Sequence, residues 1–351
     1  MRSLKNKLLI TLITFYTLSS FVPLLELDHW WIRIWDFPRL QLFIIGVAGL
    51  LLYLWSVRRS ISKIHFLLAF TIGALVLDAY RIVPYTPVYP EESRLHPIAK
   101  DSDSFSVFTL NVFQDNPQRE ALLSLLKRTS PDIILLLEVD ANWLRDVKAL
   151  TADYPFQVLK PLDNTYGIAL YSKLDILKSS INFLVEDDVP SIQATVETRA
   201  KGQIEIFCVH PRPPNPTTEE TTQRDAELIL IAKAVSKIKT PVLVMGDLND
   251  VAWSHTSRLF RRISKLQDPR IGRGPYGTFP VYLPLWRFPL DYVFHSKSLN
   301  LLGIERLEDV GSDHFPLQAT YSYEKERVKQ APNEVEEEDL EEADEIIQEV
   351  K

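Results

Sequence analysis

The chain of 351 residues contains a single cysteine, Cys208. No intramolecular disulfide can form, so the fold must be stable without one whatever the redox compartment. No cluster of Cys and His residues has the spacing of a structural zinc site, which disfavours zinc. We also find no internal repeat along the chain.

Charged residues are almost missing from three apolar stretches near the N-terminus, residues 8–25, 40–57 and 64–80, where Asp78 is the only acid. About 20 apolar residues span the core of a bilayer, so these stretches predict three transmembrane helices within residues 1–83. They could instead be buried helices of a soluble protein. Three such stretches so close together match a membrane anchor better.

Basic residues around these stretches predict their orientation. Positive charges lie at the amino end and in the loop after the second stretch, which the positive-inside rule places in the cytoplasm. Everything after about residue 85 then lies outside. A cleaved signal peptide ending near Ser19 and Ser20 would leave two spans and the same location. We therefore expect a multi-pass protein of the cell (inner) membrane with an extracytoplasmic domain. The basic residues are Arg2, Lys5, Lys7, Arg58, Arg59 and Lys63.

Proline content and charge divide the remaining chain. Residues 84–104 contain four prolines among polar residues and predict a linker that lifts the next domain off the membrane. Residues 105–323 hold 26 acids and 24 bases, without the broad basic field of a dedicated nucleic-acid binder. Residues 324–351 hold twelve acids and four bases. For this acidic C-terminal tail we prefer a solvated extension to a short amphipathic helix capped by Asn333 and Glu336.

Residues 105–323 alternate between predicted strands and predicted helices. Continuous apolar runs at 133–137 and 242–245 predict strands in a sheet that is covered on both faces. Helices are predicted from 117 to 127 and from a capping pair, Thr217 and Glu220, to about residue 239. The fold class is therefore α/β.

Polar residues follow most of these predicted strands. Hydrolysis of a phosphodiester requires neutralisation of the phosphate oxygens, activation of water and stabilisation of the leaving oxygen. Oxygen-bearing side chains such as Asn111, Glu138 and Asp313 suit a hard cation, so we expect Mg²⁺, with Mn²⁺ as an alternative. In chain order the motifs are Thr-Leu-Asn at 109–111, Glu138, His210, Gly-Asp-Leu-Asn at 246–249, Asp291 and Ser-Asp-His at 312–314.

This series of motifs resembles the endonuclease/exonuclease/phosphatase superfamily, which includes deoxyribonuclease I, exonuclease III, the neutral sphingomyelinases and the inositol polyphosphate 5-phosphatases. The resemblance covers about residues 105–321. Gly-Thr-Phe-Pro at 277–280 and Pro-Leu-Asp at 289–291 are similar to membrane-anchored bacterial members. The resemblance implies a catalytic domain at 105–323 built as a four-layer sandwich, with two packed mixed β-sheets flanked by helices, after an N-terminal transmembrane helical region.

The resemblance also implies which residues bind metal and phosphate. Glu138 is similar to the principal metal ligand of the family, with Asn111 beside it, and Asp313 is similar to a further metal or water ligand. Asn249 resembles the amide that holds a phosphate oxygen. Leu248 stands where the family often has an aromatic residue, and we expect it to pack similarly.

Acid and base roles follow from the same resemblance. Asp247 resembles the acid that orients or deprotonates the attacking water. His314 resembles the base-side histidine whose tautomer Asp291 fixes. His210 resembles the histidine that contacts phosphate or serves as acid, but the segment 166–173 supplies no acid to pair with it. The division of roles among Asp247, His210 and His314 stays open, because it varies between branches of the family.

Substrate-binding residues are less clear. Arg212 is a candidate phosphate contact, or it packs within its loop. A basic run after the Gly-Asp motif could bind nucleic acid, anionic head groups or lipid, or form a solvated helix face. Aromatic residues at 275–289 could stack on bases, dip into a membrane interface or line the core. The basic run is Arg258, Arg261, Arg262, Lys265, Arg270 and Arg273, and the aromatic residues are Tyr276, Phe279, Tyr282, Trp286 and Phe288.

Two functions follow from these observations. The favoured one is a membrane-anchored, Mg²⁺-dependent phosphodiesterase or phosphatase acting on nucleic acid or on a phospholipid-type head group. The alternative is a non-catalytic membrane protein that uses the same fold for binding or sensing. The complete set of motif residues favours the enzyme. The expected partners are the lipid bilayer and a phosphoester substrate, and the sequence identifies no protein partner.

Overall fold

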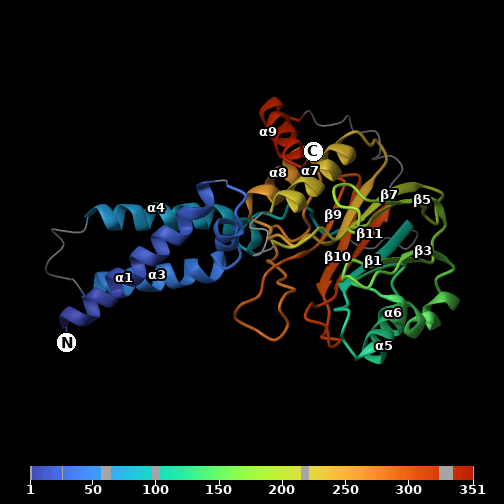
Figure 1. Cartoon of the computed structure of the whole chain (residues 1–351), viewed down its shortest axis with the longest axis horizontal. Helices are drawn as coiled ribbons and strands as arrows, with labels where there is room; N and C mark the ends of the chain where they lie inside the picture. The colour runs from blue at the N-terminus through green and yellow to red at the C-terminus, as the bar shows by residue number, and fades with distance from the viewer. Residues whose placement is uncertain are drawn as a thin grey trace.

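The computed structural model describes residues 2–25, 27–56, 65–96, 103–214, 221–323 and 335–350. A helical region and an α/β domain lie end to end (Figure 1). The three long helices of the helical region, α1 (Arg2–Phe21), α3 (Arg39–Ser56) and α4 (His65–Ile82), pack on one another. Between α1 and α3 the chain forms η1 (Val22–Leu25), α2 (Trp30–Arg33) and η2 (Ile34–Asp36).

Two segments of this region are long and apolar enough to cross a membrane, Lys7–Leu25 and Phe66–Tyr85. Trp30–Asp36 and Arg39–Trp55 pass the same test only as a pair bent by 67°, which would make a third span. The first and third predicted stretches therefore correspond to segments that pass this test, whereas the second, 40–57, passes it only as part of the bent pair. Their orientation stays a prediction, because Arg58, Arg59 and Lys63 lie outside the described residues.

Polar contacts join the long helices at the end nearest the α/β domain. Asp78 of α4 accepts hydrogen bonds from Tyr16 and Ser20 of α1, each at 2.9 Å, and pairs with Arg39 of α3. A buried carboxylate is stable only with such partners. Asp78 therefore holds the three helices together.

Two mixed sheets form the inner layers of the α/β domain, with strand orders β10-β11-β1-β2-β4-β3 and β5-β6-β7-β8-β9. The pairs β1/β2 and β7/β8 are parallel, and the other neighbours are antiparallel. The first sheet comprises β1 (Asp103–Asn111), β2 (Ile133–Leu137), β3 (Phe156–Lys160), β4 (Ile168–Ser172), β10 (Leu299–Arg306) and β11 (Leu317–Tyr323). The second comprises β5 (Ile176–Asn182), β6 (Ser191–Glu197), β7 (Gln203–Val209), β8 (Val242–Asp247) and β9 (Asp291–His295).

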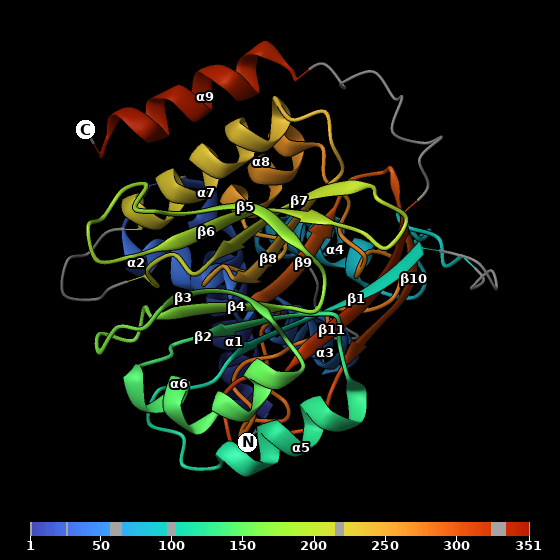
Figure 2. The same cartoon turned by 90° about the vertical axis from the view of Figure 1, so that its right-hand side faces the viewer.

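Helices cover the outer face of each sheet (Figure 2). The first sheet is covered by α5 (Arg119–Thr129), α6 (Ala141–Asp146) and the short η4 (Lys148–Ala152). The second is covered by α7 (Thr222–Ser236) and α8 (His255–Ser264), with α9 (Glu337–Gln348) outside them. The predicted four-layer α/β sandwich is therefore confirmed. Of the capping pair predicted before α7, Thr217 and Glu220 lie outside the described residues.

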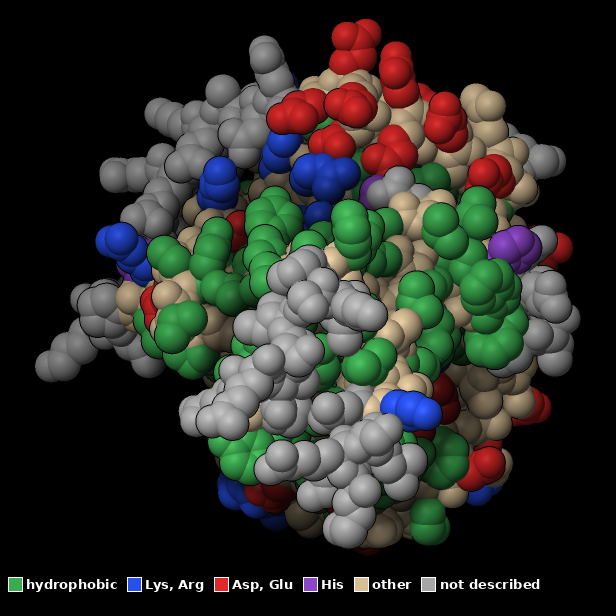
Figure 3. All heavy atoms as spheres, turned by 90° about the vertical axis from the view of Figure 1, so that its left-hand side faces the viewer, with side chains coloured by type: hydrophobic (Ala, Val, Ile, Leu, Met, Phe, Trp, Pro, Cys, Tyr) green, Lys and Arg blue, Asp and Glu red, His purple; other side chains and the backbone are tan. Residues whose placement is uncertain are grey.

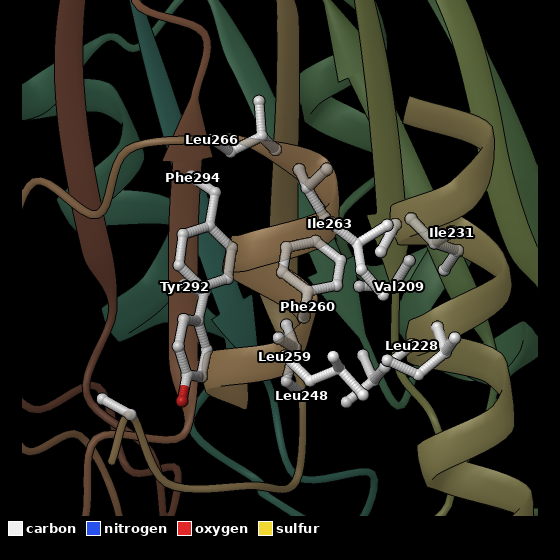
Figure 4. Close-up of a cluster of buried hydrophobic side chains, with 14 of the residues drawn as sticks. Val209, Leu228, Ile231, Leu248, Leu259, Phe260, Ile263, Leu266, Tyr292 and Phe294 are labelled. Carbon is white, nitrogen blue, oxygen red and sulfur yellow. The ribbon is translucent and has the colours of Figure 1, made fainter. Parts of the chain in front are cut away.

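Strand β8 is buried along its whole length because it contributes to two cores. Met245 faces the core between the two sheets, whereas Val244 faces the core beneath α7 and α8. Figure 4 shows this second core, where Phe260 of α8 and Leu228 of α7 approach the sheet. Each such buried side chain contributes roughly 1.5–3 kcal/mol. This double burial explains the uninterrupted apolar run at 242–245.

Residues 84–96 do not lift the α/β domain off the helical region, so the predicted linker was wrong there. η3 (Val83–Tyr85) follows α4 directly, and the buried Tyr85 donates a hydrogen bond to the carbonyl oxygen of Ala252 at 2.9 Å. Glu92 pairs with Arg261 at 2.7 Å. The polar residues that suggested a solvated segment pair instead with groups of the domain. Residues 97–102 lie outside the described part of the chain.

The acidic tail ends in a docked helix, so the preferred solvated extension was wrong for α9. Ala343 and Ile347 are buried in the core beneath α7 and α8. Arg262 pairs with Asp339 at 2.8 Å, and Lys233 pairs with Asp344 at 2.6 Å. Because the tail is so acidic, its composition did not indicate the apolar face formed by Ala343 and Ile347, which these ion pairs surround. Residues 324–334, with Asn333 of the predicted capping pair, are outside the described residues.

Candidate active site

The predicted site residues lie at strand ends where the two sheets meet. Asn111 ends β1 and Glu138 follows β2, which pair in parallel, while His210 follows β7 and Asp247 ends the parallel neighbour β8. Parallel strands deliver the residues at their carboxyl ends to one edge of a sheet. The two edges approach each other through contacts of β8 with β1 and β2.

Asn111 connects the two sheets through its side-chain amide. Its Nδ2 donates to Oε1 of Glu138 at 2.8 Å and lies 3.3 Å from Oδ2 of Asp247. Its Oδ1 accepts a hydrogen bond from the backbone N–H of Phe113 at 3.0 Å, which fixes the orientation of the amide. Glu138 also accepts from the backbone N–H of Gln114 at 3.3 Å.

Gly246 explains the glycine of the Gly-Asp motif. Its φ of 142° is in the region that favours glycine, and a Cβ there would lie 2.0 Å from the carbonyl oxygen of Val209. Asp247 follows at once, and its Oδ1 accepts from the backbone N–H of Asn249 at 2.9 Å. The spacing of the motif therefore builds a tight turn around the Asp247 carboxylate.

His314 lies between two carboxylates. Its Nδ1 is 2.8 Å from Oδ2 of Asp291, and its Nε2 is 3.5 Å from Oδ2 of Asp247. Ser312 positions the loop, because its hydroxyl donates to the carbonyl oxygen of Asn111 at 2.6 Å and accepts from the backbone N–H of His314 at 3.0 Å. Burial alone would lower the pKa of His314, but Asp291 and Asp247 raise it to about 10. This histidine is therefore protonated at neutral pH.

For Glu138, Asp247 and His210, burial is the largest influence on the pKa. Burial raises the pKa of Glu138 and of Asp247, although hydrogen bonds and the neighbouring histidines work against it. Burial lowers the pKa of His210, so its imidazole is neutral at pH 7. The Nε2 of His210 lies 3.8 Å from Oδ2 of Asp247, and its Nδ1 has no hydrogen-bond partner among the described residues. His210 thus keeps a free polar atom.

The site is open on one side. Glu138, Asn249 and Asp313 are partly exposed, whereas Asp247, Asp291, His210 and His314 are buried. The backbone carbonyl of Asp313 accepts from the N–H of Val281 at 2.9 Å, which joins this loop to the segment at 275–289. A ligand can therefore reach the partly exposed oxygens first.

The chemistry of the donor set fits a divalent cation. Four carboxylates, those of Glu138, Asp247, Asp291 and Asp313, outnumber the single protonated histidine, and hard cations prefer such oxygens. Ligand atoms of Asp247, Asp291 and His314 lie within 4.8 Å of one another, and Oδ1 of Asp291 has no hydrogen-bond partner among the described residues. His314 is a poor ligand, however, because in its protonated form both ring nitrogens carry hydrogens. The partly exposed carboxylates of Glu138 and Asp313 are the more accessible oxygen ligands, whereas Asn111 is buried and turns its Nδ2 toward Glu138.

Arg212 lies close to the site but is already engaged. Its guanidinium pairs with Glu186 and Asp188, each at 2.9 Å, and stacks 4.9 Å from the ring centroid of Tyr166. The Tyr166 ring in turn lies 5.5 Å from the His210 ring. The contact of Arg212 with a phosphate stays a prediction.

From the sequence, Phe279 was one of several aromatic candidates, whereas Thr278, Tyr166 and Gln114 were assigned no role of their own. Phe279 lies 4.8 Å from the His314 ring, and the carbonyl oxygen of Thr278 accepts from the backbone N–H of Phe315 at 3.0 Å. Both belong to the stretch at 277–280, and Tyr166 belongs to the segment 166–173, so the motifs held a signal for them. Gln114 belongs to none of the motifs.

The aromatic segment at 275–289 divides into two parts. Phe288 is buried, whereas Tyr282, Leu285 and Trp286 are 69%, 89% and 40% exposed. The side chain of Gln41 on α3 donates to the carbonyl oxygen of Leu285 at 3.3 Å. The exposed tip therefore lies beside the start of α3 (Figure 1).

The basic run after the Gly-Asp motif is not an open basic face. Most of its arginines pair inside the protein. The pairs are Arg261 with Glu92, Arg262 with Asp339, Arg270 with Asp268 and Arg273 with Glu91. Arg258 differs, because the hydrogen bond of its Nε is to the backbone carbonyl of Ser254, at 3.2 Å.

Comparison with known proteins agrees with this geometry. A family model described as Endonuclease/Exonuclease/phosphatase family matches residues 108–314. The human Nocturnin catalytic domain, solved with a bound sulfate anion, is 19% identical with a TM-score of 0.53, and the match covers 69% of this chain and 99% of that one. An endonuclease/exonuclease/phosphatase from Bacteroides vulgatus is 19% identical with a TM-score of 0.52, covering 63% and 99%. Humanized D. rerio TDP2 is 15% identical with a TM-score of 0.51, covering 63% and 99%. No curated protein sequence matches. At these identities the solved structures support the fold alone.

Proposed function

Because the chain belongs to the endonuclease/exonuclease/phosphatase family, whose members hydrolyse phosphoester bonds, we propose that it is a divalent-metal-dependent phosphoester hydrolase held at a membrane by its N-terminal helices. One observation carries the proposal. Glu138, Asp247 and His314 are far apart in the chain, yet Asn111 links the first two and Asp247 lies beside the third.

In this proposal Glu138, Asn111 and Asp313 would hold the metal ion, with Mg²⁺ the natural occupant and Mn²⁺ a substitute. When bound, the cation would neutralise charge on a phosphate oxygen. The hydrogen bond from Asn111 to Glu138 holds that carboxylate in place at the open side of the site. The Glu138 carboxylate is thus held in place before a ligand arrives.

Asp247 orients the attacking water and accepts its proton. Burial raises the pKa of Asp247, which makes its carboxylate a better base at neutral pH. Asn249 holds a phosphate oxygen. Its Nδ2 donates one hydrogen to the carbonyl oxygen of Pro211 at 2.9 Å, and the second hydrogen of the same amide remains available.

His314 supplies a positive charge and a proton. Asp291 fixes the ring through Nδ1, so the proton on Nε2 points toward Asp247 and the reacting phosphate. The protonated ring stabilises charge that develops on the phosphate or on the leaving oxygen. His210 is neutral and contributes a hydrogen bond to the phosphate.

A phospholipid-type head group suits the site better than nucleic acid. The loop that contacts His314 through Phe279 also carries the exposed Leu285 and Trp286 beside α3. Such side chains suit a membrane interface. The nearly neutral charge of residues 105–323 gives nucleic acid little electrostatic attraction.

The test is hydrolysis by the full chain in detergent, with a soluble aromatic phosphodiester as the first substrate. We expect chelator-sensitive activity that Mg²⁺ restores, and a loss of about 10²-fold or more in Asp247→Asn and in His314→Ala. Asp175→Asn and His96→Ala are matched controls. Hydrolysis that persists in both site variants would contradict the mechanism.

A comparison of substrates then distinguishes a phospholipid head group from nucleic acid and from soluble phosphoesters. Vesicles of phospholipid, single-stranded DNA and inositol phosphates are compared at equal phosphate concentration. A chain that binds one of them but hydrolyses no phosphoester would support the binding module instead.

A further inference from the structure

A cavity of about 510 Å³ lies where the helical region meets the α/β domain. Its walls come from α4, η3 and α8, and it shares no residue with the candidate active site. Its size is in the range that ligand pockets usually have, about 300–1,000 Å³. The lining combines the apolar Val76, Ala79 and Val83 with the basic Arg81, Arg258 and Arg261.

Two of the arginines at this cavity, Arg81 and Arg261, have carboxylate partners, and a third, Arg258, has none in the described part of the chain. Arg81 is 6% exposed and pairs with Asp36 at 3.3 Å, while Arg39 pairs with both Asp36 and Asp78, so these two arginines are matched by two carboxylates. Arg258 has no carboxylate within ion-pair distance among the described residues, and burial together with the nearby Arg262 lowers its pKa. A half-buried cation such as Arg258 gains from a matching anion, so the cavity favours an anionic ligand.

The opposite wall of the cavity is apolar and open. Val76, Tyr80 and Val83 are 64%, 72% and 36% exposed, and they belong to the apolar segment Phe66–Tyr85. In a bilayer this surface faces acyl chains, while Arg81 lies at the end of the segment, where head groups lie. The ligand should therefore carry both an anionic group and apolar chains.

A second cavity of about 320 Å³ continues the basic surface. It shares Tyr80, Arg258 and Arg261 with the first and adds Lys265 and Lys297, together with Glu92, which pairs with Arg261. Figure 3, which views the molecule from the end of the helical region, shows basic side chains between the acidic side chains of the tail helix and the hydrophobic side chains of the other helices. Basic residues just beyond a membrane span are typical of contacts with anionic lipids.

We propose that the 510 Å³ cavity binds the phosphate head group of an anionic membrane lipid, with the acyl chains along α4. The head group contacts Arg81 of the helical region and Arg258 of the α/β domain, and so joins the two. This site is separate from the catalytic one. It rests on the proposed function only for the membrane embedding of α4.

The experiment measures lipid binding to the full chain in detergent micelles. Dioleoyl phosphatidylglycerol is added, and binding is followed by native mass spectrometry and by the shift in unfolding temperature. We expect phosphatidylglycerol to bind and to raise the unfolding temperature, whereas phosphatidylcholine does neither. Arg258→Gln should bind phosphatidylglycerol about tenfold more weakly, because one charge-assisted contact is lost.

The control Lys178→Gln removes one exposed positive charge from β5 and should bind as the native chain does. If Arg258→Gln fails to fold, Ala79→Trp narrows the cavity from its apolar side without changing charge, and it should weaken binding similarly. Hydrolysis of the soluble phosphodiester should be unchanged in both variants, which separates this proposal from the proposed function.

Three results would overturn the proposal. The first is equal binding of phosphatidylcholine. The second is an equal stabilising shift with glycerol phosphate or inorganic phosphate alone, which would indicate a site for soluble anions. The third is undiminished binding of phosphatidylglycerol by the folded Arg258→Gln and Ala79→Trp variants.

Discussion

Among single residues, Asp247 has the densest set of contacts in the candidate site. Its carboxylate accepts hydrogen bonds from Asn249 and Asn111, and it lies within 4 Å of both His210 and His314. Burial raises the pKa of Asp247 first, Asp291 raises it further, and His314, His210 and the N–H of Asn249 lower it. Changes at any of them should therefore be measured as pH profiles as well as rates.

Asp291→Asn tests the pairing with His314. Asp291 is the largest of the influences that raise the pKa of His314 to about 10, so its loss should lower that pKa. His314 would then lose its proton at a lower pH, and the alkaline limb of the pH profile of kcat should shift to lower pH. We expect kcat on a soluble phosphodiester to fall by about 10²–10⁴-fold. An unchanged profile, with Asp175→Asn as control, would show that Asp291 does not act through His314.

Glu227 on α7 gives a prediction for stability. Burial, with a smaller effect of Glu186, raises its pKa to about 8 from an ordinary value of 4.5, and its Oε1 has no hydrogen-bond partner among the described residues. Between pH 4.5 and pH 8 the folded chain binds more protons than the unfolded chain, so stability falls as pH rises. Glu227→Gln should remove this loss and stabilise the protein at pH 8 by roughly 2–4 kcal/mol.

Thermal unfolding at several pH values measures the effect. The gain from Glu227→Gln should shrink toward pH 4.5, and the exposed Glu305→Gln should show no such trend. A gain that is the same at every pH would mean that titration of Glu227 is not its cause.

Among the helices and strands, the sequence predicted those whose pattern is local. β2 and β8 were clear because burial on both faces makes their runs continuously apolar. The docking of segment 84–96 and of α9 could not be predicted, because their polar residues pair with residues far along the chain. Glu92 and Arg261 are 169 residues apart, and Arg262 and Asp339 are 77 apart.

The same distinction applies to the candidate site. Asn111, Glu138, His210 and Asp247 follow strands, so their convergence could be expected from the strand pattern and the family resemblance. Gln114 lies in a loop, and its contact with Glu138 depends on packing that no local pattern encodes. The ion pair between Arg212 and Glu186 could not be predicted for the same reason.

The loop at 281–287 leads to a prediction about substrate access. Leu285 is 89% exposed at a tip that contacts α3. Leu285→Ser should reduce turnover of phospholipid in vesicles by roughly tenfold, because a leucine side chain in an apolar interface contributes about 1.5–3 kcal/mol. Turnover of a soluble phosphodiester should not change. Leu177→Ser, on β5, is the control. A loss on both substrates would indicate that the loop supports the site rather than the membrane contact.

At the scale of the whole molecule, the helical region and the α/β domain share one interface. Trp253 donates to the carbonyl oxygen of Asp36 at 2.7 Å, Thr221 bonds the carbonyl oxygen of Asp28, and Phe37 lies 5.6 Å from Phe288. Tyr85 is buried beside Trp253. Removal of the helical region would expose these apolar side chains to water.

A fragment of residues 103–323 should therefore be unstable. It loses Tyr85, the pairing of Glu92 and the α9 helix, whereas a fragment of residues 84–351 keeps all three. We expect the shorter fragment to unfold at a lower temperature and to aggregate, as measured by thermal unfolding and size-exclusion chromatography. Equal unfolding temperatures would mean that these contacts add little to the stability of the domain.

The direct passage from α4 into the buried Tyr85 has a consequence for how substrate is reached. In the proposed membrane anchoring, this direct junction would hold the candidate site at a constant height and tilt over the bilayer. Encounters with substrate would then be governed by lateral diffusion in two dimensions. The accessible phosphoesters would be those that travel in, or are carried along, the same leaflet.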